Sequence, residues 1–388
     1  MKIRTFELCA GYDSQLMALE RLKKNHSDFD YECIGWSEIE PSAIALHNAC
    51  FPSLSGKNFG DMTKIDWSKV ADFDLLTYST PCQSVSQAGK QTGIEEGSNT
   101  RSSILWFTRN AIIAKRPKYL LMENVEALVQ TKFIGFFNKW RKELESYGYV
   151  NYAKVINAAD YGVPQNRKRV FMLSIRNDGD KIDYHFPRKI KLKKHLVDVL
   201  EENVDEKYYL KDKFLTDMGG YVMFKGKKIF DGDGLYVETT KNFFRAGLQG
   251  VSRCLKASMH DASVCLREPI GAAIRTRCKG EWIKGEKHTP KVELGKNIAN
   301  SLTSVSKDSL VVETRLRIRR LTPRECFRLM DVDEEYIDKM MKSGVSKSGL
   351  YKAAGNSIVV ACMERILEEL LFPENNLKVA DDGQLYLF

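Results

Sequence analysis

The sequence lacks any long hydrophobic run. Nowhere in its 388 residues do about 18 consecutive apolar residues occur, so no membrane-spanning helix is predicted. The first residues, MKIRTFELCAGYDSQ, also lack the apolar core of a secretory signal peptide. We therefore expect a cytoplasmic protein with no membrane partner.

The chain also lacks the paired cysteines of a disulfide framework. Its nine cysteines are an odd number, and none forms a Cys-x-x-Cys pair. Cys254, His260, Cys265 and Cys278 lie in one stretch, but their spacings match no zinc pattern. We expect reduced thiols, at least one of them free, and no bound metal.

No internal repeat or low-complexity tract is present, and 43% of the side chains are hydrophobic. A chain of this length and composition can bury a sizeable core and form more than one lobe. These properties are compatible with a globular enzyme and exclude a small disulfide-stapled domain.

Positive charge is concentrated in the centre of the chain, although the net charge is only +9. Residues 181–320 contain 29 Lys and Arg against 18 Asp and Glu, whereas the rest contains 31 against 33. Charge alone leaves two interpretations open, a solvated lysine-rich face or a polyanion-binding surface.

Short β-rich runs alternate with helical patterns in the first third. Predicted strands are IRTFELCA, YECIGWS, FDLLTYS and YLLME, and predicted helices are DSQLMALERLKK, PSAIALHNA and SSILWFTRNAIIA. This alternation predicts a doubly wound α/β fold with a parallel sheet covered on both faces.

Three further segments complete the predicted organisation. VNYAKVINA and RKRVFMLSI, which flank the turn-forming DYGVPQN, predict two more strands. From about residue 181, lysine runs and glycine-rich turns predict a separate, irregular domain. GNSIVVACMERILEEL then predicts an amphipathic helix that packs back on the first lobe.

Residues able to carry chemistry follow the predicted strands. An Ala10-Gly11 turn follows the first strand, Glu38 the second and Cys82 the third, while Glu123 closes the fourth. Carboxyl ends of parallel strands meet at the ligand-binding edge of such a sheet. A thiol there is a candidate nucleophile, and a carboxyl reached through apolar residues is a candidate proton carrier because desolvation raises its pKa. The alternatives to these functional roles are structural: Cys82 as a core cysteine, Glu38 as a solvated side chain and Glu123 as a helix cap.

Gln165, Arg167 and Arg169 occupy alternate positions of QNRKRVF. In a strand, alternate residues share one face, and two guanidiniums on one face can hold a phosphate or a base edge.

Taken in order, these motifs resemble the cytosine-C5 DNA methyltransferase family. The matching features are the Ala-Gly turn, the acidic strand tip, Pro-Cys-Gln, Glu-Asn-Val, Gln-x-Arg-x-Arg, RLTPRECFRLM and AGNSIVV, which span residues 6–360. The resemblance implies an S-adenosylmethionine-dependent methyltransferase fold with a smaller target-recognition domain. It places the catalytic and cofactor-binding domain at 1–187, completed by 345–388, and the recognition domain and hinge at 188–344. It also implies a monomer acting on double-stranded DNA, with the basic central stretch binding phosphates.

The family mechanism acts on a cytosine flipped out of the duplex. By resemblance, the thiolate of Cys82 adds to C6 while Glu123 holds N3, and C5 then takes the methyl group of S-adenosylmethionine. Loss of the C5 proton and elimination of Cys82 restore the ring; the resemblance assigns no residue to the base of that step. Arg167 and Arg169 would bind the flipped cytosine and its backbone.

The remaining site residues are also implied by the resemblance. Predicted cofactor-binding residues are Cys9, Ala10, Gly11, Tyr12, Asp13, Ser14, Glu38 for the ribose, Ile39 against the adenine, Asp61, Met62, Ile104, Asn356 and Ser357. Predicted substrate-binding residues are Pro81, Gln83, Asn124 and Gln165. The chain departs from the family pattern at Cys9 and Ile39, where aromatic residues are usual, and at Asp13, where glycine is common.

Two other functions share this pattern. An RNA cytosine-C5 methyltransferase would have the same catalytic residues, although the long basic insert favours duplex DNA. A non-catalytic nucleic-acid-binding scaffold is the other alternative, and retention of Cys82, Glu123 and both arginines argues against it. The chain is compatible with a bacterial or a phage gene and with a cognate restriction endonuclease.

Overall fold

The computed structural model describes residues 1–81, 96–97, 101–179, 184–209, 215–217, 222–224, 227–229, 235–239, 244–249, 251–255, 262–275, 291–296 and 309–373. The chain divides into two compact units. The first comprises Met1–Val199, Val251–Met259 and Pro323–Phe388, and the second Leu200–Gly250 and His260–Thr322. Residues 188–199, 251–255 and 323–344 belong to the first unit, whereas the sequence pattern placed them in the recognition domain. One reason is a short parallel pair between β6 (Gln165–Asn166) and β13 (Ser252–Arg253).

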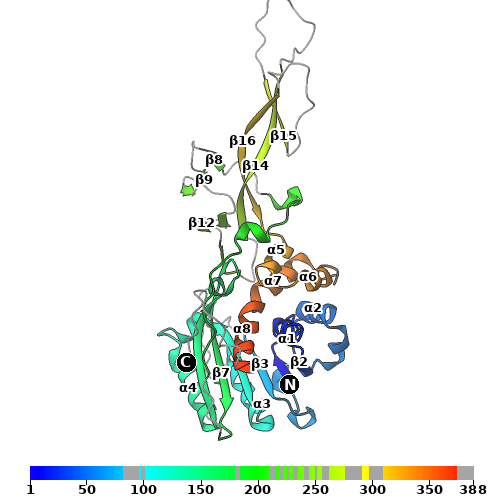
Figure 1. The fold of residues 1–388 in the computed structure, drawn as a ribbon, viewed down its shortest axis with the longest axis vertical. Helices are drawn as coiled ribbons and strands as arrows, with labels where there is room; N and C mark the ends of the chain where they lie inside the picture. Colours follow the sequence, from blue (N-terminus) through cyan, green and yellow to red (C-terminus); the bar gives the residue numbers. More distant parts are fainter. Residues whose placement is uncertain are drawn as a thin grey trace, which may run out of the picture. The chain divides into compact units, whose positions relative to one another are not determined.

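A six-stranded sheet forms the centre of the first unit (Figure 1). Its order is β2-β1-β3-β4-β7-β5, with β1 Lys2–Leu8, β2 Asp30–Ser37, β3 Leu75–Tyr78, β4 Tyr119–Val125, β5 Tyr149–Asn157 and β7 Lys168–Arg176. Neighbours among β1 to β4 are parallel, as predicted, but β7 is antiparallel to both β4 and β5. The sequence pattern predicted parallel strands for the first third and assigned no direction to the strand that becomes β7. The connection from β5 is too short for the crossover that parallel neighbours need.

Helices cover both faces of this sheet. They are α1 Ser14–Asn25, α2 Pro41–Cys50, α3 Thr108–Lys115, α4 Ile134–Ser146, α5 Pro323–Arg328, α6 Glu334–Met341, α7 Lys347–Asn356 and α8 Val360–Leu371. Short 3-10 turns are η1 Pro52–Lys57, η2 Met62–Lys64, η3 Trp67–Lys69, η4 Arg101–Phe107, η5 Glu126–Val129, η6 Ala158–Tyr161, η7 Leu196–Val199 and η8 Glu206–Tyr208. Side chains of α3 and α4 join the core on one face, and α1 packs beside α8 on the other (Figure 1).

Two predicted helices begin later than their apolar patterns suggested. SSILWF belongs to the 3-10 turn η4, and α3 starts only at Thr108. The C-terminal pattern was expected to form one helix, but α7 ends at Asn356 and α8 starts at Val360. The Arg167 guanidinium donates hydrogen bonds to the carbonyls of Gly355 and Ser357, close to the point where the helix is interrupted.

The second unit is built from antiparallel strands where an irregular domain was expected. β8 Leu215–Asp217, β9 Val222–Phe224 and β10 Lys227–Ile229 form one sheet. β11 Leu235–Thr239, β12 Phe244–Gln249, β14 Ala262–Arg275, β15 Lys291–Lys296 and β16 Ser309–Arg320 form another. Across the described ranges of both units, no helix has the length and apolarity needed to cross a membrane.

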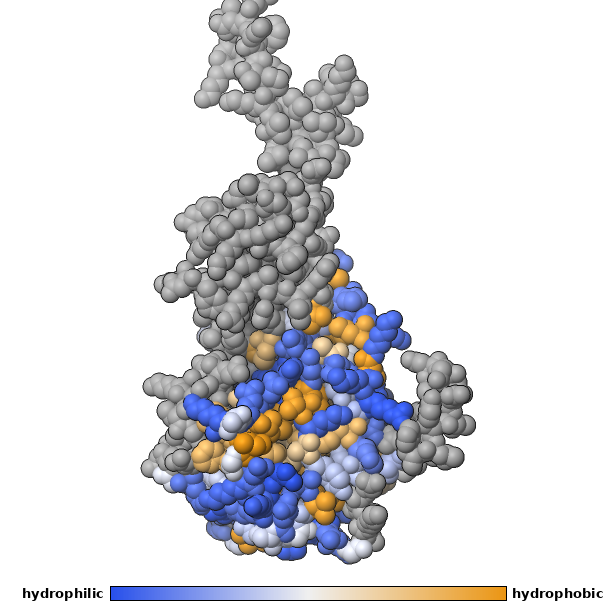
Figure 2. All heavy atoms as spheres, turned by 90° about the vertical axis from the view of Figure 1, so that its left-hand side faces the viewer, coloured by the Kyte–Doolittle hydropathy of each residue, from blue (hydrophilic) through white to orange (hydrophobic). Residues whose placement is uncertain are grey.

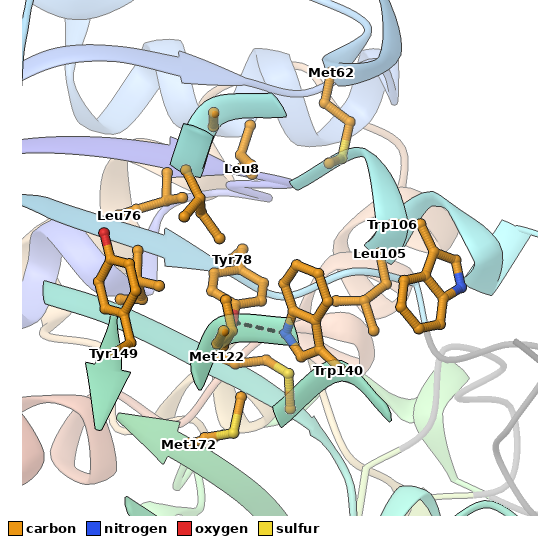
Figure 3. Close-up of a cluster of buried hydrophobic side chains, with 14 of the residues drawn as sticks. Leu8, Met62, Leu76, Tyr78, Leu105, Trp106, Met122, Trp140, Tyr149 and Met172 are labelled. Carbon is orange, nitrogen blue, oxygen red and sulfur yellow. Dashed lines mark hydrogen bonds between the residues drawn. The ribbon is translucent and has the colours of Figure 1, made fainter. Parts of the chain in front are cut away.

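Side chains from five strands, α3, α4 and neighbouring turns form the main hydrophobic core (Figure 3). Leu8, Tyr78, Met122 and Met172 belong to β1, β3, β4 and β7, and Trp140 of α4 is fully buried among them. The Trp140 indole Nε1–H donates to the Tyr78 hydroxyl at 3.1 Å, which satisfies its polar atom inside the core. Because strand side chains alternate, the next residues along the strands face the opposite side.

On the side shown in Figure 2, hydrophilic side chains alternate with several apolar areas over the described surface, the broadest of them near its centre. Separately, two of the exposed large apolar side chains, Val150 and Val155, belong to β5. That strand lies at the edge of the sheet, so only one neighbouring strand pairs with it.

Glu7 of β1 is a buried carboxyl on the face opposite the main core. It is 0% exposed and accepts hydrogen bonds from Thr5 Oγ1 at 2.9 Å and from Thr77 Oγ1. Burial, with a smaller contribution from the Asp13 carboxylate, raises the pKa of Glu7 well above its ordinary value of 4.5.

Replacing Glu7 by Gln is expected to make the stability of the protein less dependent on pH. Because the folded-state pKa of Glu7 is raised, its stabilising contribution is complete below the ordinary pKa and is lost as pH rises through the raised pKa. Each unit of that rise corresponds to about 1.4 kcal/mol. Urea unfolding is measured at about pH 5.5 and pH 8.5. Between these two values the free energy of unfolding should fall more for wild type than for Glu7→Gln. The exposed Glu32→Gln is the control, and equal losses in wild type and Glu7→Gln would contradict the prediction.

Candidate active site

The predicted site residues gather at one edge of the sheet. Strands β1 to β4 run parallel, so the segments that follow them lie at the same end. From β1 the chain goes outward to β2 and returns to β3 on the other side of β1, which makes the β1–β3 junction a switch point for ligand binding. The Ser79 hydroxyl donates to the Cys9 carbonyl at 3.3 Å across this junction.

The segment after β1 forms a loop with three residues of left-handed backbone. Cys9, Gly11 and Asp13 have φ of 56°, 64° and 73°, and the Ala10 amide donates to the Ser37 carbonyl at 3.1 Å. A Cβ atom placed on Gly11 would meet no atom of the described residues within 4 Å, apart from those of its chain neighbours. The backbone is therefore open to a ligand at the start of α1, where free N–H groups and the helix dipole favour carboxylates.

Glu38 is held rigidly at the tip of β2. Its Oε2 accepts from the Gly11 amide at 3.0 Å, and its Oε1 accepts from the amides of Ile39 and Glu40 at 2.8 and 2.9 Å. Beside it, the Ile39 side chain is 68% exposed. A fixed carboxylate next to an apolar surface fits a ribose and an adenine ring, so the residues present fit S-adenosylmethionine.

Other predicted cofactor residues close around this loop. The Ser14 and Ser357 hydroxyls are 2.6 Å apart, which joins the start of α1 to the segment after α7. Cys9 Sγ lies 3.7 Å from Met62 Sδ, and Ile104 packs partly buried against the core.

Three predicted cofactor residues have other surroundings. The Tyr12 side chain is buried and meets Phe327 edge-on at 5.5 Å between ring centroids, so it packs in the interior. Asp61 caps η2 by accepting from the Thr63 amide at 3.0 Å, and Asn356 is exposed.

Glu123, near the end of β4, is the central carboxyl of the site. It is 8% exposed, and its Oε1 lies 3.1 Å from Arg169 Nε. Burial raises the pKa of Glu123 above its ordinary value, although the charges of Arg169 and Arg167 oppose that rise. The proximity of Arg169 alone would favour an ionised carboxylate, but the loss of hydration is the larger effect. Glu123 is thus suited to hold a proton that it can donate.

Asn124 connects the end of β4 to the segment after β3. It is 2% exposed, its Nδ2 donates to the Thr80 carbonyl at 3.2 Å, and its Oδ1 accepts from the Val125 amide. Pro81, which follows Thr80, is half-buried. Cys82 and Gln83 lie outside the described residues. The hydrogen bond from Asn124 fixes the Thr80 carbonyl, two residues before Cys82.

Gln165 and Arg167 hold chain segments together. Gln165 is fully buried; its Nε2 donates to the Leu329 carbonyl at 2.6 Å, and its Oε1 accepts from the Leu255 amide. Arg167, which is 3% exposed, donates to the carbonyls of Leu255, Gly355 and Ser357. The structure thus shows Gln165 and Arg167 holding chain segments together and Arg169 as the arginine that reaches Glu123, while substrate contacts of Gln165 and Arg167 stay a prediction.

Cys254 is a neighbour of the arginines that sequence reasoning had considered only as a metal ligand. Its Sγ lies 3.4 Å from Arg167 Nη1 and 3.6 Å from Arg169 Nη2. Burial opposes ionisation of the thiol, but the two guanidiniums together lower its pKa. No sequence spacing signals this contact, because residues 85 and 87 positions apart meet only in the folded chain.

Within the part of the chain that the structure covers, no group of three or more His, Cys, Asp and Glu side chains is arranged to hold a metal ion. His260 and Cys278 lie outside the described residues. Six described cysteines, Cys9, Cys33, Cys50, Cys254, Cys326 and Cys362, are free thiols.

The sheet order, the reversed β7 and the cofactor loop after β1 define the fold of the S-adenosylmethionine-dependent methyltransferases. The chain belongs to the C-5 cytosine-specific DNA methylase family, whose model matches residues 3–371. It is a DNA cytosine-5 methyltransferase that takes its methyl group from S-adenosylmethionine.

Individual relatives agree with this assignment. The type II methyltransferase M2.ScrFI of Lactococcus lactis subsp. cremoris is 33% identical, with 95% of this chain and 99% of that protein covered. The orphan methyltransferase M.SPRI of Bacillus phage SPR is 29% identical, with 95% and 98% covered. The crystal structure of S. pombe Dnmt2 methyltransferase matches with a TM-score of 0.59 and 18% identity over 96% of this chain and 99% of that one, which supports the fold.

Proposed function

We propose that Cys82 is the nucleophile and Glu123 the proton donor of methyl transfer to cytosine in duplex DNA. The observation that carries this assignment is the buried Glu123 carboxyl, whose pKa is raised although Arg169 lies 3.1 Å away. A protonated carboxyl donates a hydrogen bond, which a carboxylate does not.

Each residue has a stated part in the reaction. Cys82 Sγ forms a bond to C6 while Glu123 donates its proton toward N3, so that C5 becomes the nucleophilic carbon. Bound S-adenosylmethionine supplies the methyl group that C5 accepts. The C5 proton then leaves to a base, the Sγ–C6 bond breaks to release the Cys82 thiolate, and N3 returns its proton to Glu123, which restores the aromatic ring. Arg169 orients Glu123 and contacts the base, while Arg167 fixes the surrounding segments.

The cofactor would be held by the loop after β1 and the tip of β2. The Glu38 carboxylate accepts the ribose hydroxyls, and Ile39 packs against the adenine. Backbone amides at the start of α1 receive the methionine carboxylate, beside the open backbone at Gly11. Asp61, Met62, Ile104, Asn356 and Ser357 complete the predicted set, as the sequence pattern suggested.

The basic stretch 181–320 would bind DNA phosphates around the target sequence. The charge excess leaves a merely solvated surface open, and membership of a DNA methylase family supports phosphate binding over it. We infer that the enzyme acts as a monomer in the bacterial cytoplasm, either beside a cognate restriction endonuclease or from a phage genome. Type II and phage relatives support both settings.

A covalent-trap experiment tests the nucleophile and the substrate together. Purified protein, S-adenosylmethionine and mixed-sequence duplex DNA containing 5-fluorocytosine are incubated and analysed on a denaturing gel. Fluorine at C5 cannot leave as a proton does, so the adduct persists and wild type should give a shifted band. Cys82→Ser should give none, whereas Cys33→Ser, which changes a buried cysteine of β2, should behave as wild type.

RNA of matched sequence with 5-fluorocytosine is the second arm of this experiment. A band on RNA without one on DNA would replace the proposed substrate by RNA. No band on either, with S-adenosylhomocysteine binding intact, would show a non-catalytic scaffold.

A further inference from the structure

Asp13 occupies a position where the family pattern commonly has glycine, and its backbone explains why. Its φ of 73° and ψ of 60° are left-handed, a conformation that glycine adopts without cost and Asp tolerates better than most residues. The Asp13 Oδ1 accepts from the Leu16 amide at 3.0 Å, so the side chain caps the N-terminus of α1. This side chain is 0% exposed and therefore points into the interior.

The second oxygen of Asp13 meets a histidine from another element. Asp13 Oδ2 lies 3.2 Å from His47 Nε2, and both side chains are 0% exposed. The His47 ring stacks on Trp36, with centroids 3.7 Å apart and planes inclined by 20°. Asp13 Oδ2 and both ring nitrogens of His47 are buried and have no hydrogen-bond partner among the described residues, so this close approach is the polar contact between the two side chains, in a region that excludes water.

These contacts join the two segments that form the cofactor site. Asp13 belongs to the loop after β1, whereas His47 lies in the last turn of α2, which starts directly after Glu40. Trp36 precedes the tip of β2, where Glu38 accepts hydrogen bonds from the Gly11, Ile39 and Glu40 amides. The loop and the β2–α2 connection are thus held together twice, by Glu38 at the surface and by Asp13 with His47 beneath it.

We propose that Asp13 and His47 form a buried positioning pair that fixes the methionine-binding loop relative to the adenosine-binding segment and thereby sets the affinity for S-adenosylmethionine. Both side chains are 0% exposed, so they would act on the cofactor through the backbone they hold, although the resemblance had placed Asp13 among the cofactor-binding residues. Asp13 supplies through its side chain a constraint that glycine, which has no side chain, cannot supply. The inference rests on the cofactor site proposed above.

Binding of S-adenosylhomocysteine, measured by calorimetry, tests the pair independently of catalysis. Asp13→Asn keeps the left-handed backbone and the cap but removes the charge, and His47→Gln removes the imidazole. Each is expected to weaken binding about 10-fold, a change of about 1.4 kcal/mol. The double variant should also weaken binding about 10-fold and not 100-fold, because each single change already breaks the same contact.

Kinetics separate positioning from general destabilisation. KM for S-adenosylmethionine should rise about 10-fold in both variants, while kcat at saturating cofactor stays within about twofold of wild type. Asp13→Gly, which fits the backbone without strain, provides a second test if Asp13→Asn does not fold. Asp66→Asn, which changes the cap of η3, is the matched control and should leave binding unaltered.

Unchanged binding in the Asp13 and His47 variants, or an additive 100-fold loss in the double variant, would overturn the pair. Glu38→Ala distinguishes this result from failure of the proposed site. If Glu38→Ala weakens binding strongly and the pair variants do not, only the pair is refuted. If Glu38→Ala has no effect, the cofactor site itself is misplaced.

Discussion

Glu123→Gln is expected to lower kcat for methyl transfer by about 10²–10⁴-fold, the range typical for loss of a general acid. Glutamine keeps the shape of the side chain but has no acidic proton to give to N3. Binding of S-adenosylhomocysteine should be unchanged, because in the proposed site Glu123 does not contact the cofactor. Single-turnover methyl transfer to duplex DNA measures the chemical step directly.

Glu123→Gln should also remove the fall in the rate of methyl transfer that wild type shows at high pH. The protonated carboxyl is the active form, and the raised pKa of Glu123 keeps that form populated at higher pH than an ordinary Glu would. Wild-type rates should therefore fall as pH rises through this pKa, while the residual rate of Glu123→Gln should lack that fall. Glu126→Gln, three residues further along the chain, is the control. A full rate in Glu123→Gln would exclude Glu123 as the proton donor.

Arg167→Met is expected to have the largest effect on stability, lowering the free energy of unfolding by about 3–5 kcal/mol. The variant leaves the carbonyls of Leu255, Gly355 and Ser357 without their donor in the interior. Arg167→Lys should recover part of the loss, because one ammonium cannot reproduce the planar fork of a guanidinium. Urea unfolding followed by circular dichroism provides the measurement.

Arg169→Met is the matched comparison. Its guanidinium is closer to solvent and lies beside Glu123, so this variant should lose activity with a much smaller loss of stability. If Arg167→Met kept wild-type stability and lost only activity, Arg167 would be a substrate contact, as the Gln-x-Arg-x-Arg pattern first suggested.

Much of the fold follows from local patterns. β1 to β4, α1 and α2 lie where apolar periodicity placed them, because strand and helix periods are set by residues close together in the chain. β7 was predicted as a strand, but its antiparallel direction was not, since apolar strands of either direction have similar sequences. The break between α7 and α8 was missed because Arg167, some 190 residues earlier in the chain, binds the carbonyls of Gly355, near the end of α7, and of Ser357, at the start of the break.

The sequence by itself determined the order of the motifs, and with it the family, the cofactor and the ends of the strands where Gly11, Glu38 and Glu123 stand. Successive parallel strands end at one edge of a sheet, so residues at those ends converge whatever lies between them. Only the tertiary structure decided where side chains point. It turned Arg167 toward backbone carbonyls and Asp13 toward His47, because contacts between residues far apart in the chain are set by packing and desolvation, which no local period encodes.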